Sequence, residues 1–233
     1  MEVEDFESMF AQAFDVTKHG EHDQSTHGSW ATGNYENLND WIKDEEKVFS
    51  SYAEREKYYE DTLNSQRISA YDSQKYSGAI EQYESRLGYD LNEALRDPQI
   101  SDSGFMDIVE GLDGAISAAP PIEEELIAYR GVKGNGLDFF EKLKTGDTFV
   151  DKAYTSTTID PQVAKQFGGV TGYYEGLVFR YKLPAGTQGI FPVSFKERTS
   201  GEDTSEAEFL LPRNSEFKVP AQRGKVWDSA LAP

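Results

Sequence analysis

The pattern of apolar and polar positions divides the chain into a helical part and a part made of short strands. From about residue 36 to 118, apolar residues recur at three- and four-residue spacing, which is the period of an amphipathic helix. The pattern begins with Trp41, Ile42, Val48, Phe49 and Tyr52 and continues through Ile80, Tyr83, Leu87, Leu91 and Leu95. Pro98 should end one helix, since proline disfavours helical geometry in the residue before it. A further helix is expected over residues 106–118, before Pro120-Pro121.

After Pro121 the pattern favours short strands. Two short helices interrupt them, one over residues 137–143 and one that Asp160-Pro161 opens and Gly168-Gly169 ends, with proline suited to a first helical turn. The segments expected as strands are rich in β-formers or alternate in polarity. They are residues 126–130, 146–150, 153–158, 176–183, 189–195 and, as a hairpin-like pair, 206–211 and 216–220. Many short strands after a helical half predict an α+β fold.

Length and composition narrow the class of protein. The chain of 233 residues is enough for one large domain or a domain with an arm, and 37% hydrophobic residues supply a core. The absence of cysteine excludes disulfides and thiolate metal sites. No apolar run approaches the ~20 residues of a membrane span, and the acidic start lacks a signal-peptide pattern. We expect a cytoplasmic protein with no membrane partner.

The net charge of −19 bears on the choice of partner. Such a surface repels the phosphates of nucleic acids, so no nucleic-acid partner is expected. The charge favours solubility, and it is also compatible with attraction to a basic, arginine-bearing protein.

All three histidines lie in one polar segment near the N-terminus, at His19, His22 and His27. With Asp23 they could bind a metal, but the glycine-rich context favours a solvated linker, and no metal is expected. The segment also resembles short His-Asp-Gln-Ser-x-His stretches in structural proteins of tailed phages. We therefore expect the protein to act in a host cytosol or to be delivered with a phage particle.

Three short pieces carry the residue types needed to break a charged N-glycosidic bond. They are the stretches 129–131 (YRG), 154–158 (YTSTT) and 206–213 (EAEFLLPR). The fixed fork of an arginine suits phosphate, and a carboxylate beside a ribosyl carbon stabilises an oxocarbenium-like transition state. In an extended strand Glu206 and Glu208 would face one cleft. The alternative is that both are solvated strand charges, and that Arg130 makes only a surface ion pair.

In this order the three pieces resemble the Arg–Ser–Glu class of mono-ADP-ribosyltransferases, the class of the clostridial actin-modifying toxins and related exoenzymes. That family has a strand ending in Tyr-Arg-Gly, a later strand with Ser-Thr-Ser, and a Glu-x-Glu before Leu-Leu-Pro-Arg. The resemblance extends upstream to residues 76–96 and 112–121. Two positions depart from it. Thr158 stands where serine is more common, and Asn214 stands where glycine is common, although asparagine tolerates a left-handed turn.

The resemblance implies an ADP-ribosyltransferase fold, in which N-terminal helices pack on two antiparallel β-sheets with an NAD cleft between them. It places the catalytic domain at residues 64–226. Residues 1–35 would form a flexible N-terminal arm and residues 227–233 a C-terminal tail. The accessory helical segment, residues 36–63, would either dock on the core or form an arm that binds a target. The polar loop 197–205, with Phe195 nearby, corresponds to the family's target-recognition loop.

The resemblance also implies which residues bind NAD. Arg130 would bind its phosphates, and Gly131 would let the backbone pass close to it. Arg96 and Asn92, one turn apart, would project from one helix face toward the dinucleotide. Phe167 would lie near phosphate and nicotinamide. Thr157 joins this cofactor-binding set, although its main effect is expected on the strand.

Catalysis is assigned to three residues on the same grounds. Glu208 would bond the ribose 2′-hydroxyl and stabilise the cation as nicotinamide leaves, and Glu206 would engage the acceptor. Ser156 would fix Glu208 by a hydrogen bond, the alternative being a strand serine. No histidine lies in the folded part of the chain, which argues against a Ser-His-Asp hydrolase.

The expected function is therefore transfer of ADP-ribose from NAD to an arginine of a target protein, with release of nicotinamide. Glutamate at the first position of Glu-x-Glu goes with arginine acceptors in this family. The phage-like segment favours a target protein of a bacterial host. The alternatives are an NAD glycohydrolase, in which water replaces arginine, and a non-enzymatic phage virion or interaction protein.

Overall fold

The computed structural model describes residues 38–45, 52–65, 70–97, 104–134, 137–140, 142–169, 176–192, 206–223 and 225–231. The expected arm 1–35 with its histidines, Phe195 and the loop 197–205 lie outside these residues.

The helices in the described residues follow the predicted pattern. They are α2 (Leu38–Glu45), α3 (Tyr52–Ser65), α4 (Ala70–Glu84), α5 (Leu87–Arg96), α6 (Met106–Ala118), α7 (Leu137–Phe140) and α8 (Pro161–Phe167). The expected stop before Pro98 is confirmed, since α5 ends at Arg96 with Asp97 as its C-cap. Asp160 caps α8 by accepting a hydrogen bond from the backbone N–H of Gln162 at 2.8 Å. The expected helix over 137–143 is shorter than predicted.

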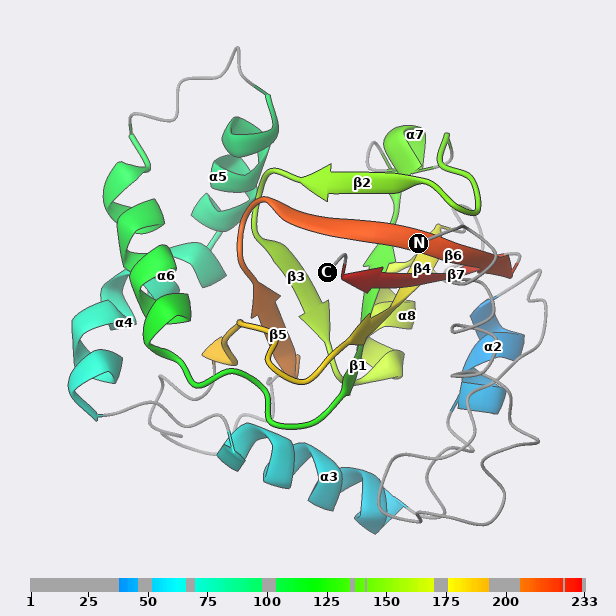
Figure 1. Cartoon of the computed structure of the whole chain (residues 1–233), viewed down its shortest axis with the longest axis horizontal. Coiled ribbons are helices and arrows are strands. Elements are labelled where there is room, and N and C mark those ends of the chain that lie inside the picture. Colours follow the sequence, from blue (N-terminus) through cyan, green and yellow to red (C-terminus); the bar gives the residue numbers. More distant parts are fainter. Residues whose placement is uncertain are drawn as a thin grey trace.

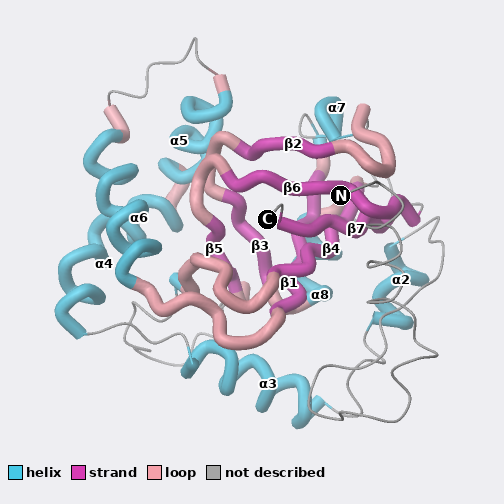
Figure 2. The backbone as a smooth tube through the Cα atoms, in the orientation of Figure 1, coloured by secondary structure: helices cyan, strands magenta, loops and turns pink. Residues whose placement is uncertain are grey.

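The described strands form one seven-stranded sheet in the order β2-β6-β7-β4-β1-β3-β5. Their bounds are β1 (Leu126–Val132), β2 (Thr148–Asp151), β3 (Thr155–Thr158), β4 (Leu177–Leu183), β5 (Glu208–Leu211), β6 (Ser215–Arg223) and β7 (Val226–Leu231). The α+β class is confirmed, and Figure 2 shows the strands at the centre with helices around them.

Two details of the sheet differ from the expectation of two antiparallel sheets. β4 and β7 are parallel, and hydrogen bonding is continuous from β2 to β5. The joint between β1 and β3 is narrow, however, because the register there is the single pair Tyr129↔Thr158. The β3–β5 ribbon is therefore nearly separate from the five-stranded part, and the candidate catalytic residues lie along this joint.

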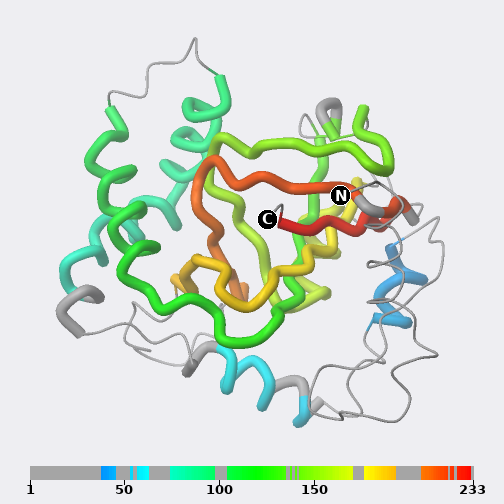
Figure 3. Tube along the Cα trace, in the orientation of Figure 1, coloured from blue at the N-terminus to red at the C-terminus, as the bar shows by residue number. Residues whose placement is uncertain are grey.

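The predicted hairpin between residues 206–211 and 216–220 is wrong. β5 pairs with β3, whereas β6 pairs with β2 and β7. Asn214 takes a left-handed φ of 63° in the turn after β5, as its residue type allows. The chain then leaves β5 for the other end of the sheet. Figure 3 shows β5 lying beside β3, far from it in sequence.

The strand expected over residues 189–195 is also absent from its described part, 189–192. Only an isolated bridge, Ile190↔Leu210, is present there. Gly189 packs directly on the ring of Phe209, where a Cβ would lie 2.4 Å from it, and Pro192 has no N–H to extend a ladder.

Helices cover the sheet at two places. On one side α4, α5 and α6 form a layer beside β3 and β5 (Figure 1), with Ile80, Leu91 and Leu112 buried against Leu210. On another side α2 buries Leu38 and Trp41 against β1, α8 and β4. The main core between them is aromatic; its rings include Phe149, Phe179, Tyr181, Phe217 and Trp227.

α2 is fixed to the sheet by a buried polar cluster as well as by apolar contacts. Glu45, the last residue of α2, accepts hydrogen bonds from the Tyr129 hydroxyl at 2.8 Å and the Trp41 indole at 3.1 Å. Its carboxylate is 3.5 Å from Arg180, which also pairs with Asp228. Within the segment 36–63, α2 is thus docked on the core.

Candidate active site

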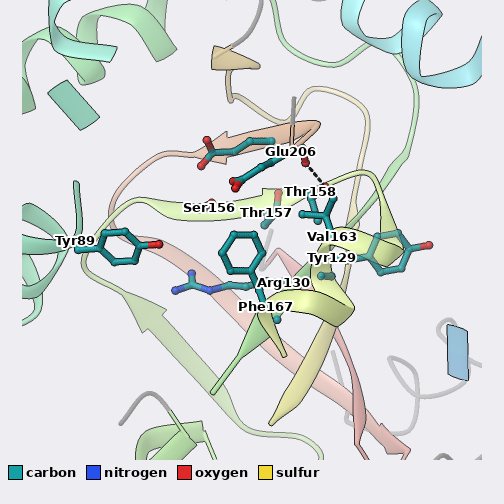
Figure 4. Close-up of a pocket in the computed structure, with 12 residues that line it drawn as sticks. Tyr89, Tyr129, Arg130, Ser156, Thr157, Thr158, Val163, Phe167 and Glu206 are labelled. Carbon is teal, nitrogen blue, oxygen red and sulfur yellow. Dashed lines mark hydrogen bonds between the residues drawn. The ribbon is translucent and has the colours of Figure 1, made fainter. Parts of the chain in front are cut away.

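A pocket opens where the joint between β1 and β3 meets α8, the start of β5 and the N-terminal half of α5. Figure 4 shows Arg130 and Phe167 at the centre of this space, with Tyr89 to the left and Glu206 above them in the view. The residues that line it are Tyr89, Tyr129, Arg130, Gly131, Ser156, Thr157, Thr158, Val163, Ala164, Phe167, Glu206 and Glu208. Seven of the nine sequence-predicted site residues therefore lie around one hollow; Arg96 and Asn92 do not line it.

The threonines beside Ser156 hold β5 in place. The Thr157 hydroxyl donates to the Phe209 carbonyl at 2.6 Å, and the Thr158 hydroxyl donates to the Glu206 carbonyl at 2.5 Å. Both hydroxyls thus bind backbone of the segment that carries the two glutamates. The side chain of Ser156 instead hydrogen-bonds the side chain of Glu208.

Glu206 and Glu208 reach the same pocket for a reason other than strand alternation. β5 begins only at Glu208, and Ala207 has a positive φ of 44°, so the three residues are not extended. The backbone N–H of Ile159 bonds the Ala207 carbonyl at 3.0 Å and secures this turn. The turn leaves Glu206 exposed and Glu208 partly buried, so the two carboxylates have different environments.

The environment of Glu208 favours its protonated form. Burial raises the pKa of Glu208 to about 7; the Ser156 hydrogen bond opposes this, and the nearby charges of Glu206 and Glu84 add to it. Burial, and then Glu84, raise the pKa of Glu206 as well. A perturbed carboxylate in a pocket is a physical mark of a functional site.

Arg130 is held close to α8 because the next residue has no side chain. A Cβ on Gly131 would lie 2.1 Å from the Ala164 carbonyl oxygen and 2.2 Å from the Gly168 nitrogen. These are backbone atoms that cannot turn aside, so glycine is required for β1 to approach α8. The same approach brings Phe167, 38% exposed, to the pocket.

Arg96 and Asn92 are held by residues that do not line the pocket. Two guanidinium nitrogens of Arg96 bind Asp151, Nε and Nη2 each at 2.9 Å. The Asn92 amide donates to the Tyr83 hydroxyl at 3.0 Å, and its oxygen accepts from the backbone N–H of Tyr154 at 3.2 Å. Asn92 thus joins α4 and α5 to the residue before β3.

The arginine of the Leu-Leu-Pro-Arg stretch has a partner of its own. Arg213 binds Asp113 of α6 through Nε at 3.0 Å and Nη2 at 2.9 Å, and the Tyr154 hydroxyl donates to the same carboxylate at 2.7 Å. These bonds tie the end of β5 and the start of β3 to one helix, which stabilises the ribbon that carries Ser156 and Glu208.

Sequence reasoning missed several residues that line or support the pocket. Tyr89 lies three residues before Asn92 on α5, a spacing that puts both on one helix face and could have drawn attention to it. Val163 and Ala164 line the pocket from α8. Asp151, which contacts both Arg96 and Arg130, carried no signal in the sequence.

In the part of the chain that is described, no helix is long and apolar enough to cross a membrane. The same residues contain no group of three or more His, Cys, Asp or Glu side chains arranged to hold a metal ion.

Comparison with known proteins defines the class. A model of the ADP-ribosyltransferase exoenzyme family matches residues 28–229, and the chain therefore belongs to this family, whose members use NAD as substrate. Exoenzyme T of Pseudomonas aeruginosa is 37% identical over 79 residues, which is 34% of this chain and 17% of that protein. The ADP-ribosyltransferase toxin AexT of Aeromonas salmonicida is 37% identical over 79 residues, 34% of this chain and 16% of the toxin. The matches therefore span less than a fifth of these relatives.

Solved structures support the fold. Vis toxin from Vibrio splendidus has a TM-score of 0.57 at 22% identity, covering 78% of this chain and 87% of the toxin. An ADP-ribosyltransferase from Clostridium botulinum has a TM-score of 0.56 at 18% identity, covering 78% of this chain and 96% of that enzyme. The fold is thus that of ADP-ribosyltransferase toxins.

Proposed function

We propose that the protein transfers a single ADP-ribose from NAD to the guanidinium group of an arginine in a target protein and releases nicotinamide. The observation that carries the proposal is the pocket itself, which is lined by Arg130 and by both Glu206 and Glu208. An arginine fork suits the diphosphate, and a carboxylate suits a ribosyl cation.

The reaction divides between the two glutamates. As the bond between ribose C1′ and the nicotinamide nitrogen breaks, its electron pair leaves with nicotinamide and positive charge develops on the ribose. Ionised Glu208, oriented by Ser156, stabilises that charge at short range. A guanidinium nitrogen of the acceptor then bonds C1′, and its proton passes to a base.

Glu206 has the right exposure to act on the acceptor. It is exposed at the pocket, where a side chain from another protein can reach it, whereas Glu208 is partly buried. An arginine side chain is protonated in water, so a carboxylate beside it both orients the guanidinium and accepts a proton during attack. The related Vis toxin has been crystallised in complex with agmatine, a small guanidinium compound, which supports the choice of this acceptor class.

The same exposure favours a second candidate function, NAD glycohydrolysis. Water reaches Glu206 as readily as an arginine does, so hydrolysis is expected as a slow competing reaction. Glu206→Gln separates the two activities. Transfer should fall by about 100-fold or more because the acceptor loses its base, while slow hydrolysis persists. If transfer survives this change, the role of Glu206 is wrong.

The decisive experiment incubates the protein with labelled NAD and either agmatine or a bacterial lysate. We expect labelled agmatine and labelled protein bands that disappear with Glu208→Ala, and mass spectrometry of the bands should place the label on arginine. Label on another residue type would refute arginine specificity. Nicotinamide release without any labelled acceptor would favour the glycohydrolase, and no consumption of NAD would favour the non-enzymatic alternative.

A further inference from the structure

We propose that Asp151 is a positioning residue of the diphosphate site, which sets the direction of Arg130 and holds Arg96 beside it. The inference rests on the proposed function, because it assigns to Arg130 the phosphates of NAD. Asp151 is the last residue of β2, and its side chain is 7% exposed.

The carboxylate of Asp151 accepts hydrogen bonds from four residues. Oδ1 accepts from Arg96 Nε at 2.9 Å and from the backbone N–H of Ala153 at 3.1 Å. Oδ2 accepts from Arg96 Nη2 at 2.9 Å, the Thr155 hydroxyl at 3.1 Å and Arg130 Nη1 at 3.3 Å. Ala153 and Thr155 fix the carboxylate relative to β3, so the two arginines bind to a group that is itself rigid.

Charge explains why an aspartate is needed at this point. Arg96 and Arg130 come from α5 and β1, and without a shared anion their guanidinium groups would repel each other and sample many rotamers. Burial tends to raise the pKa of Asp151, but the Arg96 hydrogen bonds and the charges of Arg130 and Arg96 outweigh it and lower the pKa. The group therefore stays ionised, and the two arginines with Asp151 carry a net charge of +1 toward the ligand.

The two arginines are bound unequally. Arg96 forms a bidentate pair with Asp151, whereas Arg130 uses one nitrogen at a longer distance and keeps its other donors toward the pocket that it lines. Asp151 thus orients the Arg130 side chain and leaves most of its guanidinium donors available to a ligand. In this arrangement Arg96 acts through Asp151 and is not itself among the residues that line the pocket.

The test compares Asp151→Asn with the wild type and with Glu216→Gln. Glu216 is exposed on β6 and is the register partner of Val150, the residue before Asp151 on β2. Glu216→Gln therefore removes one carboxylate near Asp151 without changing a contact to Arg130 or Arg96. An asparagine has the shape of aspartate but directs an N–H₂ group at donors. We expect KM for NAD to rise by about 10-fold or more with a smaller change in kcat, as for loss of a charge-assisted hydrogen bond.

A second readout does not depend on turnover. Titration with ADP-ribose, which retains the diphosphate, should show binding weakened about 10-fold in Asp151→Asn, whereas binding of nicotinamide, which lacks phosphate, should be unchanged. Glu216→Gln should match the wild type in both. A purely structural role would lower the melting temperature and leave the ratio of these two affinities unchanged.

Several outcomes would overturn the inference. A wild-type KM for Asp151→Asn refutes it, and a lower KM would show that Asp151 competes with the diphosphate. If Asp151→Asn does not fold, Thr155→Val removes one fixing bond and should raise KM for NAD about 3-fold, and no change there refutes the inference. Wild-type protein that binds ADP-ribose but never consumes NAD would refute the proposed function alone. The comparison of ADP-ribose binding by Asp151→Asn and wild type would then still test the role of Asp151. Failure to bind ADP-ribose would refute both.

Discussion

The ionised side chain of Glu208 lowers the stability of the folded protein. Its carboxylate lies where burial raises its pKa to about 7, so the ionised form is held there at a free-energy cost. Ser156 reduces that cost and Glu206 adds to it. A positively charged ribosyl group would offset the cost of burying the ionised carboxylate. The pocket would therefore stabilise the transition state, in which that charge develops, more than the ground state.

This environment predicts the pH dependence of activity. In the free enzyme kcat/KM for NAD hydrolysis should rise with pH and level off above about 7, as Glu208 ionises. Glu206→Gln removes a like charge and should shift the midpoint to lower pH. Measuring kcat/KM from pH 5 to 9 for both proteins tests this, and a midpoint near 4.5 in the wild type would show that Glu208 is not desolvated as described.

The same shift has a consequence for stability, with a definite sign. Because the folded-state pKa of Glu208 lies above its value in an unfolded chain, its stabilising contribution is full below about pH 4.5 and is lost as pH rises through about 7. The difference in melting temperature between Glu208→Gln and wild type should therefore grow in favour of the variant from pH 5 to 8. A constant difference would contradict the shift.

Single residues were predictable from the sequence where a local motif names them. Arg130, Ser156, Glu206 and Glu208 belong to short stretches whose residue types already indicate the chemistry, and the structure gathers all four around one pocket. Asp151 was not predictable, because its place depends on partners far along the chain. Asp151 meets Arg96 across 55 residues and Arg130 across 21.

At the scale of elements, the turn at Ala207 shows the limit of periodicity. An alternating strand would also have put Glu206 and Glu208 on one face. The prediction that both line one cleft is therefore correct, but the strand geometry on which it rested is not. The actual turn depends on bonds from Thr158 and Ile159 to the Glu206 and Ala207 carbonyls. Such bonds come from another strand and leave no trace in the local pattern.

The contribution of α2 to the stability of the fold can be measured with two substitutions. Glu45→Ala leaves buried Arg180 with one carboxylate fewer and the Tyr129 hydroxyl without this acceptor. We expect a loss of about 3 kcal/mol in the free energy of unfolding, the size typical of breaking a buried pair. Lys43→Ala on the same helix removes an exposed ion pair with Asp40 and should change the free energy by roughly 0.5 kcal/mol or less.

Urea unfolding of both α2 variants measures these changes. Because Tyr129 precedes Arg130 on β1, Glu45→Ala should also weaken NAD binding, whereas Lys43→Ala should not. Equal stability of the two variants would mean that α2 is not docked through Glu45.

At the scale of the whole molecule, the class of fold followed from element order, but the path of the chain through the sheet did not. Helices followed by short strands predict α+β, and most described elements lie where the pattern put them. The order β2-β6-β7-β4-β1-β3-β5 brings β5 beside β3 and sends β6 to the other end. Local sequence favours pairing neighbours, whereas the burial of Leu210 against the helical layer and of Phe209 and Leu211 in the main core favours the pairing of β5 with β3.

The charge of the whole chain predicts how salt acts on stability. A net charge of −19 makes the compact state repel itself, and this repulsion is spread over distances that salt screens well, since the Debye length falls from about 30 Å at 0.01 M to about 10 Å at 0.1 M. The partly buried pairs, such as Arg96–Asp151, are screened less. Raising NaCl from 0.01 to 0.2 M at pH 8 should therefore raise the melting temperature by roughly 3 °C, the equivalent of about 1 kcal/mol. Near the pI of about 4.5 the net repulsion vanishes, so the same salt step should leave the melting temperature unchanged or lower it. A fall at pH 8 would mean that attractive ion pairs outweigh the repulsion, and the acidic surface would then be a source of stability.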